Sequence, residues 1–313
     1  MTDRKKYGIL ETDGHLDDGG CEMDIQKYLN GNEYTGITTG KSGAVVYDVY
    51  NEYILKVFSR RDVDDERFES YKIEALFYRS KAGRGYLPEV FVTDIKENET
   101  VLLMKKYKCP APDAAARITR AIAQVHADDI PDFLENDTSG QERLYEAAIS
   151  QALDGWKDVL AEHRGAFDER PLHLAAERIN DIIVMNAPEK RVLLHGDLHF
   201  DNLLEDDNGD IRICDWQCVR TGDPSEDLSF FLSRAEAEDI TVDRDAFLQS
   251  YSRAVMEITG READIGSIIR RMSAANVVTT FTSWHYFLHG SSEERVQEIY
   301  GKMEADLMAL QIG

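Results

Sequence analysis

The first third of the chain carries short apolar runs that are rich in β-branched and aromatic residues, a composition typical of strands. These runs predict strands at 44–50, 53–58 and 100–107. Residues 62–81 differ from them, because their apolar positions fall roughly on one face of a helix. The pattern therefore predicts a small unit made of strands and one helix.

The rest of the chain has mainly the spacing of amphipathic helices. The expected helices cover residues 142–163, 172–185, 243–259, 264–289 and 292–310. The segment 109–112 contains two prolines and breaks the pattern, so it is interpreted as a linker. These elements predict an α+β chain with a β-rich N-terminal lobe at 1–107 and a larger helical lobe at 108–313.

A hairpin is predicted in the middle of the second lobe. Residues 202–205 and 211–214 have the composition of strands. The Asn-Gly dipeptide that begins at Asn208 is a strong signal for a tight turn between them. Such a hairpin would bring Asp215 back beside Asn202.

Three polar residues around this hairpin have the spacing of a kinase catalytic loop and its metal ligands. Asp197 lies five residues before Asn202, and Asp215 lies thirteen residues after it. The first Asp can accept the proton of a substrate hydroxyl, whereas the Asn and the second Asp can hold Mg²⁺ against nucleotide phosphates. A plain polar turn would not require all three residues at these intervals. The spacing therefore predicts phosphoryl transfer from a nucleoside triphosphate with Mg²⁺.

This chemistry also needs groups that hold the nucleotide, and the N-terminal lobe supplies candidates. Gly40, Ser42 and Gly43 lie in a loop just before the predicted strand 44–50, where backbone N–H groups can bind phosphates. Lys56 stands alone among the apolar residues of its strand, where it is costly to bury unless it is paired. Glu74 on the following helix is the expected partner. The pair would direct the ammonium toward the α- and β-phosphates.

Other interpretations fit parts of the same segments. Residues 36–42 nearly form a P-loop, but three residues rather than four separate the glycines, and a strand follows instead of a helix. A metal-dependent hydrolase would use Asp and His ligands, and the candidates are His195, Asp197, His199, Asp201, Asp13 and His15. Such enzymes commonly add an Asn-His pair, and no Asn-His dipeptide occurs in the sequence. A kinase-like binding module without activity is a further alternative, against which the full set of catalytic residues argues.

The chain resembles the aminoglycoside phosphotransferase family and its small-molecule kinase relatives, which include choline kinases. The similar segments run in order from about residue 36 to 232, and they are the glycine loop, the helix ending in His126, the loop 195–202, Asp215-Trp216-Gln217 and the segment 222–231. The resemblance implies a protein-kinase-like fold with two lobes. It also implies that Asp227 braces the catalytic loop. His199 and Asp201 depart from the family pattern, which often has small residues or proline there.

The resemblance assigns roles to the candidate residues. It implies that Asp197 is the catalytic base and that Asn202 and Asp215 bind Mg²⁺. Lys56 and Glu74 would orient the phosphates of ATP or GTP. The glycine loop of Gly40, Ser42 and Gly43 would complete the nucleotide site in the N-terminal lobe.

The charge of the chain narrows the range of partners. With 36 basic and 59 acidic residues, the net charge is −23. Nucleic acids and anionic membranes are therefore not expected partners, and no apolar run approaches the length of a membrane span. The absence of a signal peptide and the scattered cysteines favour the cytoplasm.

An acidic surface attracts cations, so the expected acceptor is a small hydroxylated cation. The glycine loop is most similar to that of the aminoglycoside phosphotransferase branch, so the resemblance makes an aminoglycoside or another antibiotic the first choice, and choline, an amino alcohol or a sugar is the second.

Overall fold

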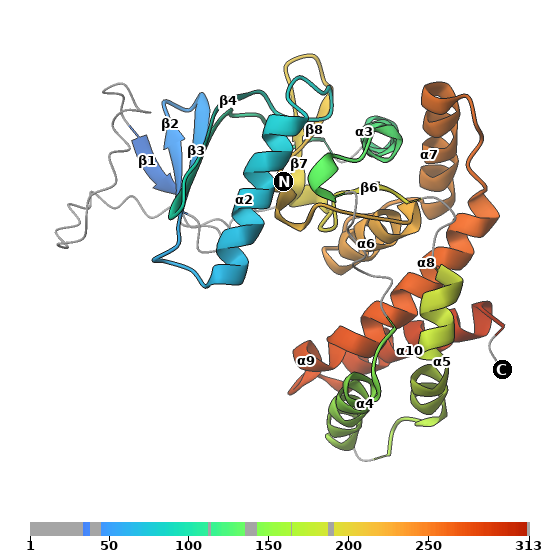
Figure 1. The fold of residues 1–313 in the computed structure, drawn as a ribbon. Coiled ribbons are helices and arrows are strands. Elements are labelled where there is room, and N and C mark those ends of the chain that lie inside the picture. Colours follow the sequence, from blue (N-terminus) through green and yellow to red (C-terminus); the bar gives the residue numbers. More distant parts are fainter. Residues whose placement is uncertain are drawn as a thin grey trace, which may run out of the picture. The chain divides into compact units, whose positions relative to one another are not determined.

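The computed structural model describes residues 34–37, 45–111, 114–134, 143–163, 165–186 and 191–311. The chain forms two compact units that are not continuous in sequence (Figure 1). Unit 1 consists of residues 1–111 and 201–219, and unit 2 consists of residues 112–200 and 220–313. The predicted division of the chain into lobes at residue 107 stays a prediction.

Unit 1 is built on a five-stranded antiparallel sheet with the strand order β1-β2-β3-β5-β4. The strands are β1 (Tyr34–Ile37), β2 (Val45–Val49), β3 (Tyr53–Ser59), β4 (Val90–Ile95) and β5 (Glu99–Lys105). Residues 50–52 connect β2 to β3, and the N–H of Glu52 donates to the carbonyl oxygen of Val49 at 3.1 Å. Tyr50 and Asn51, at the centre of this turn, have φ angles of 57° and 59°, as in a type I′ turn. The central position of β3 accounts for its buried apolar residues.

One helix, α2 (Asp65–Ser80), packs against this sheet. Its first turn is capped by Asp64, whose side chain accepts a hydrogen bond from the N–H of Arg67. On its buried side, Phe77 stacks on Trp216 with 4.2 Å between the ring centroids. Trp216 comes from the second segment of unit 1, so aromatic stacking joins two segments that are far apart in the sequence.

That second segment contains the predicted hairpin. Its strands are β7 (Leu203–Glu205) and β8 (Ile211–Ile213), and they pair in antiparallel fashion. The N–H of Ile213 donates to the carbonyl oxygen of Tyr86 at 2.7 Å, which fastens the hairpin to the first segment. A 3₁₀ turn (Trp216–Cys218) follows. The hairpin predicted from the Asn-Gly dipeptide is therefore confirmed.

Unit 2 is mainly helical in its described residues, with a two-stranded pairing of β6 (Val192–Leu194) and β9 (Arg220–Gly222). Its longer helices are α3 (Ala115–Ala127), α4 (Glu146–Ala161), α5 (Arg170–Asn186), α6 (Pro224–Ala237), α7 (Arg244–Thr259), α8 (Ile265–Thr279) and α10 (Glu293–Ala309). Helices α4, α5, α8 and α10 enclose the main core, where Trp156, Ile179 and Met303 are fully buried. Over the part of the chain that the structure describes, no helix combines the length and the apolar character that a membrane span needs.

The single helix predicted at 264–289 is divided in the structure. After α8 come a π-helical turn (Thr280–Trp284) and a short helix α9 (His285–Leu288). The indole N–H of Trp156 donates to the carbonyl oxygens of the first two residues of this turn, at 3.2 and 3.1 Å. The wider turn leaves these acceptors available, and a buried indole from another helix satisfies them.

Gly155 in α4 marks a close approach of helices. A Cβ built at Gly155 falls on the imidazole ring of His285, whereas a Cβ at Gly301 in α10 is in ordinary contact, 3.5 Å from its nearest neighbour. Replacing a helical glycine with alanine normally stabilises a protein by about 1 kcal/mol. We expect this gain for Gly301→Ala, and a loss of about 1–3 kcal/mol for Gly155→Ala because of overpacking. Urea unfolding of both variants measures the difference, and a stabilised Gly155→Ala would contradict the close packing.

Candidate active site

Lys56, in the middle of β3, is paired with two carboxylates of unit 1. Its Nζ lies 3.0 Å from Oε1 of Glu74 on α2 and 2.9 Å from Oδ1 of Asp215, which follows β8. The Glu74 side chain is fully buried, whereas that of Asp215 is 31% exposed. The structure therefore gives Lys56 the partner predicted from the sequence and adds Asp215 to the pair.

The charges of this cluster depend on one another. Burial alone would lower the pKa of Lys56, but the adjacent carboxylates of Glu74 and Asp215 raise it above its ordinary value, so the ammonium stays charged. Burial raises the pKa of Glu74 to about 7, although attraction to Lys56 opposes the shift. The desolvation of Glu74 is therefore compensated in part by the lysine beside it.

The backbone at Asp215 is unusual. Its φ angle of 70° lies in the left-handed region, which residues other than glycine seldom adopt. The fully buried Trp216 follows, and its indole N–H donates to the carbonyl oxygen of Ile213 at 2.8 Å. Gln217 donates from Nε2 to Oδ1 of Asp215 at 2.7 Å. A packed indole and a side-chain amide thus fix a strained residue and its carboxylate. The sequence-based prediction assigned no role to Gln217. Its position two residues after Asp215 is the signal that could have identified it.

Asn202 lies beside this cluster within unit 1. It ends a short 3₁₀ turn and is buried. Its carbonyl oxygen accepts a hydrogen bond from the N–H of Cys214 at 2.9 Å. The hairpin therefore brings Asn202 next to the residue that precedes Asp215, as predicted. Carboxylate and side-chain amide oxygens are hard ligands of the type that Mg²⁺ binds, so the donor set of Asn202 and Asp215 fits this ion.

Asp197 belongs to unit 2 and lies on the loop after β6. The preceding Gly196 has a φ angle of 82°, which glycine adopts without steric cost. The N–H of Asp197 donates to Nδ1 of His195 at 3.2 Å, and Nε2 of His199 lies 3.8 Å from Oδ2 of Asp197. With 41% of its side chain exposed, Asp197 can be reached by a molecule from solvent.

A buried carboxylate holds the turn that carries Asp197. Asp227 in α6 accepts hydrogen bonds from the N–H groups of His195 at 2.8 Å and Gly196 at 2.9 Å. Its Oδ2 also lies 3.3 Å from Nε2 of His126 in α3. Burial disfavours the charged carboxylate, but the hydrogen bond from His126, attraction to the nearby imidazoles and the Gly196 N–H lower the pKa of Asp227 to about 2. The brace that the family resemblance implies is therefore visible in these hydrogen bonds.

The predicted phosphate loop cannot be placed in the same way. Gly40, Ser42 and Gly43 lie outside the described residues. The strands on either side of them, β1 and β2, are antiparallel neighbours with Ile37 opposite Val46. The role of the glycine loop therefore stays a prediction.

The alternating His and Asp residues do not share the surroundings expected of a hydrolase metal centre. His195 is buried and its Nδ1 already accepts a hydrogen bond, whereas Asp197 is partly exposed. Asp13 and His15, the further ligands considered, lie outside the described residues. The geometry of the loop thus favours a braced turn over a set of metal ligands.

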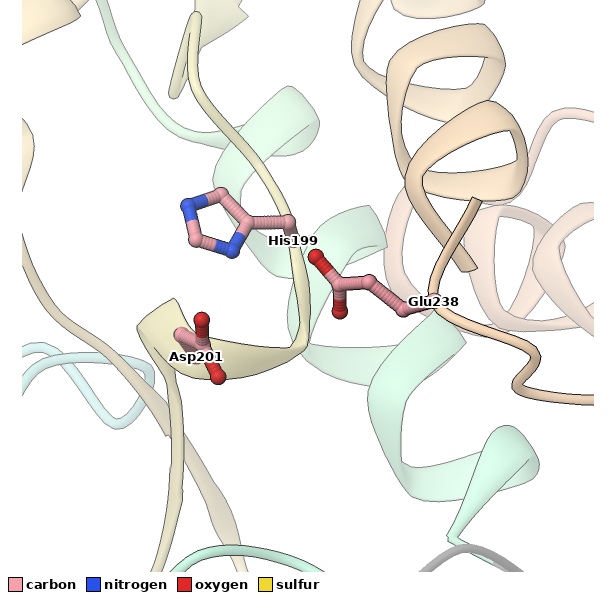
Figure 2. Close-up of side chains that lie close together, drawn as sticks. All are labelled: His199, Asp201 and Glu238. Atoms are coloured by element: carbon pink, nitrogen blue, oxygen red, sulfur yellow. The ribbon is translucent and has the colours of Figure 1, made fainter. Parts of the chain in front are cut away.

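Figure 2 shows three other acidic and histidine side chains, those of His199, Asp201 and Glu238. His199 is half-buried, and the other two are exposed. His199 and Glu238 belong to unit 2, whereas Asp201 begins the second segment of unit 1. We therefore assign the three no joint role.

Comparison with known proteins identifies one protein family. The model of the phosphotransferase enzyme family, APH, matches residues 33–263, which is more than half of the chain. The matched range includes Lys56, Glu74, Asp197, Asn202 and Asp215. No curated protein sequence matches the chain significantly.

Several solved structures have a similar fold. Aminoglycoside phosphotransferase APH(2'')-Ib, bound to ADP, gives a TM-score of 0.54 at 17% identity, covering 91% of this chain and 98% of that chain. An ethanolamine kinase from Plasmodium vivax gives 0.53 at 14% identity, covering 88% and 82%. Choline kinase LicA from Streptococcus pneumoniae gives 0.53 at 14% identity, covering 92% and 96%. At these identities the likeness shows the fold, and the predicted protein-kinase-like α+β fold is confirmed.

The buried ion pair makes a prediction for stability. Lys56→Ala leaves Glu74 buried without its cation, so we expect a loss of about 3–5 kcal/mol. Lys96 provides a matched control, because its Nζ lies 2.9 Å from Glu99 at an exposed position in the same unit. Lys96→Ala should cost less than about 1 kcal/mol. Urea unfolding measures both losses, and equally small values would show that the Lys56 cluster does not stabilise the fold.

Proposed function

Because the chain belongs to the phosphotransferase enzyme family, we propose that it is a Mg²⁺-dependent O-phosphotransferase that moves the γ-phosphate of ATP or GTP to a small acceptor. As a member of this family, the chain is an enzyme that acts on the hydroxyl group of a small molecule. The main support for nucleotide-dependent phosphoryl transfer is the position of Lys56. Lys56 Nζ lies between Glu74 and Asp215, at 3.0 and 2.9 Å, as in kinases that direct a lysine to the α- and β-phosphates.

The proposed nucleotide site lies in unit 1. Lys56 binds the α- and β-phosphates, and Glu74 keeps its ammonium in place. Asn202 and Asp215 hold Mg²⁺, and Gln217 keeps the Asp215 carboxylate in its orientation. Bound Mg²⁺ supplies the positive charge that neutralises the β- and γ-phosphates. The glycine loop before β2 contributes backbone N–H groups to the same phosphates.

Asp197 is the proposed catalytic base. Its partly exposed carboxylate accepts the proton of the acceptor hydroxyl as the oxygen attacks the γ-phosphate. Phosphoryl transfer depends mainly on positioning and charge neutralisation. The hydrogen bonds of Asp227 to the turn before Asp197 supply part of that positioning.

The proposed acceptor is a small hydroxylated cation, and an aminoglycoside or another antibiotic is the first candidate. The net charge of −23 supports a cationic acceptor, because an acidic surface raises the local concentration of cations. Inactivation of the drug, and hence antibiotic resistance, would follow. The likeness to ethanolamine and choline kinases supports a metabolic kinase of an amino alcohol as the second candidate.

We also propose a cytoplasmic location, where nucleoside triphosphates are available. In the described part of the chain, Cys109 is a free and exposed thiol, which fits a reducing compartment. The acidic charge argues against nucleic acids and anionic membranes as partners. A kinase-like module without activity is less well supported, because Lys56 and Asp197 accompany both proposed metal ligands.

A turnover assay tests the proposal directly. The full chain is mixed with Mg²⁺ and either ATP or GTP, and nucleoside diphosphate release is followed with aminoglycosides, other hydroxylated antibiotics, choline, ethanolamine and sugars. We expect release that depends on one class of acceptor. Absence of release, together with no thermal shift by Mg²⁺ and nucleotide, would contradict the proposed function.

Two substitutions separate the base from the metal ligand. Asp197→Ala should lower kcat by about 10²–10⁴-fold and leave the thermal shift by Mg²⁺ and nucleotide unchanged. Asp215→Ala should remove both turnover and the Mg²⁺-dependent part of the shift. Asp207→Ala, at an exposed carboxylate in the turn of the hairpin, serves as the control and should retain both. Near wild-type turnover of Asp197→Ala would show that another group accepts the proton.

A further inference from the structure

A row of buried polar side chains connects three helices of unit 2. Tyr251 in α7, His126 in α3 and Asp227 in α6 are 2%, 7% and 2% exposed. The hydroxyl of Tyr251 lies 2.8 Å from Nδ1 of His126, and Nε2 of His126 lies 3.3 Å from Oδ2 of Asp227. The same carboxylate accepts the N–H groups of His195 and Gly196. The row therefore begins on a helix outside the loop and ends at the backbone next to Asp197.

The chemistry of Asp227 fixes the direction of the hydrogen bond between it and His126. The ionised carboxylate of Asp227 accepts only, so Nε2 of His126 carries a proton and donates to it. Nδ1 of the same ring then meets the hydroxyl of Tyr251, which can donate to it or accept from it. Burial raises the pKa of Tyr251 well above its ordinary value, so the hydroxyl keeps its proton. One orientation of the imidazole satisfies both neighbours, and turning the ring over would break both contacts.

We infer that Tyr251 is a positioning residue: its hydroxyl fixes the ring of His126, and through His126 and Asp227 it holds the His195–Gly196 turn in the geometry that directs Asp197. The catalytic part of this inference rests on the proposed function, whereas the structural part does not. The hydroxyl of Tyr251 contacts Nδ1 of His126, so its effect on the loop passes through this imidazole.

The positioning effect comes from the hydroxyl group of Tyr251 in particular. The rings of His126 and Tyr251 meet edge to face, with 5.6 Å between their centroids. Tyr251→Phe preserves this ring contact and the packing of α3 against α7, and it removes one hydrogen bond. His126 then loses the partner that fixes its ring, and the carboxylate of Asp227 loses part of its support.

Amide hydrogen exchange of the full chain tests the structural part. In Tyr251→Phe, the amides of His195 and Gly196 should exchange about fivefold faster than in the wild type, as expected for the loss of one hydrogen bond. Tyr300→Phe is the matched control. Tyr300 is equally buried in unit 2, and its hydroxyl accepts the N–H of Leu172 and donates to the carbonyl oxygen of Asp168. That control should speed exchange at Leu172 and leave His195 and Gly196 unchanged.

Steady-state kinetics and a conservative variant test the catalytic part. Tyr251→Phe should lower kcat about fivefold with the KM for nucleotide unchanged, and Tyr300→Phe should leave kcat unchanged. His126→Gln keeps an N–H donor for Asp227, so it should retain more protection of the Gly196 amide than His126→Ala.

The exchange and kinetic results can be separated. The inference is overturned if Tyr251→Phe leaves exchange at His195 and Gly196 unchanged, or if Tyr300→Phe accelerates it equally. If the wild type turns over no acceptor, the proposed function fails, and the exchange rates still decide whether Tyr251 positions the turn.

Discussion

The ammonium of Lys56 lies between the carboxylates of Glu74 and Asp215, and the rest of the candidate site depends on this contact. It joins a strand, a helix and the segment after the hairpin. Neither Lys56 nor Glu74 is stable alone in this place, because a buried charge without a partner costs several kcal/mol. The attraction that stabilises the fold of unit 1 therefore also sets the charge distribution that a nucleotide would meet.

Unit 2 also contains a buried carboxylate that its neighbours keep charged, but its hydrogen-bond donors differ from those in unit 1. Asp227 is buried, and backbone N–H groups and an imidazole keep it ionised. A carboxylate held in this way has almost no freedom to move, so the turn bonded to it has little either. In contrast, Asp197 stays partly exposed at the end of that turn. Rigid support beneath an accessible carboxylate is the arrangement that a catalytic base requires.

The sequence predicts those parts of the site that depend on local pattern. A lone lysine in an apolar strand identified Lys56, the Asn-Gly turn placed Asn202 near Asp215, and the family resemblance is confirmed. Strands β1 and β4 were not predicted. β1 has four residues and contains Gly36, so it has little local pattern, whereas β4 has the β-branched and aromatic composition of a strand and was missed. The π-helical turn depends on the indole of Trp156, which is 124 residues away from Thr280. Periodicity along the chain carries no information on such long-range contacts.

Unit 1 is made from two segments of the chain, and this has a consequence for biosynthesis. A ribosome releases residues 1–111 first, then the whole first segment of unit 2, residues 112–200, and only afterwards residues 201–219. During that interval Phe77 lacks the indole on which it stacks, and the ammonium of Lys56 lacks its second carboxylate. The nascent sheet must therefore persist with an incomplete core until the hairpin emerges. Premature termination before residue 201 leaves a polypeptide without either proposed magnesium ligand, so a product shortened there could not compete for the metal in this way.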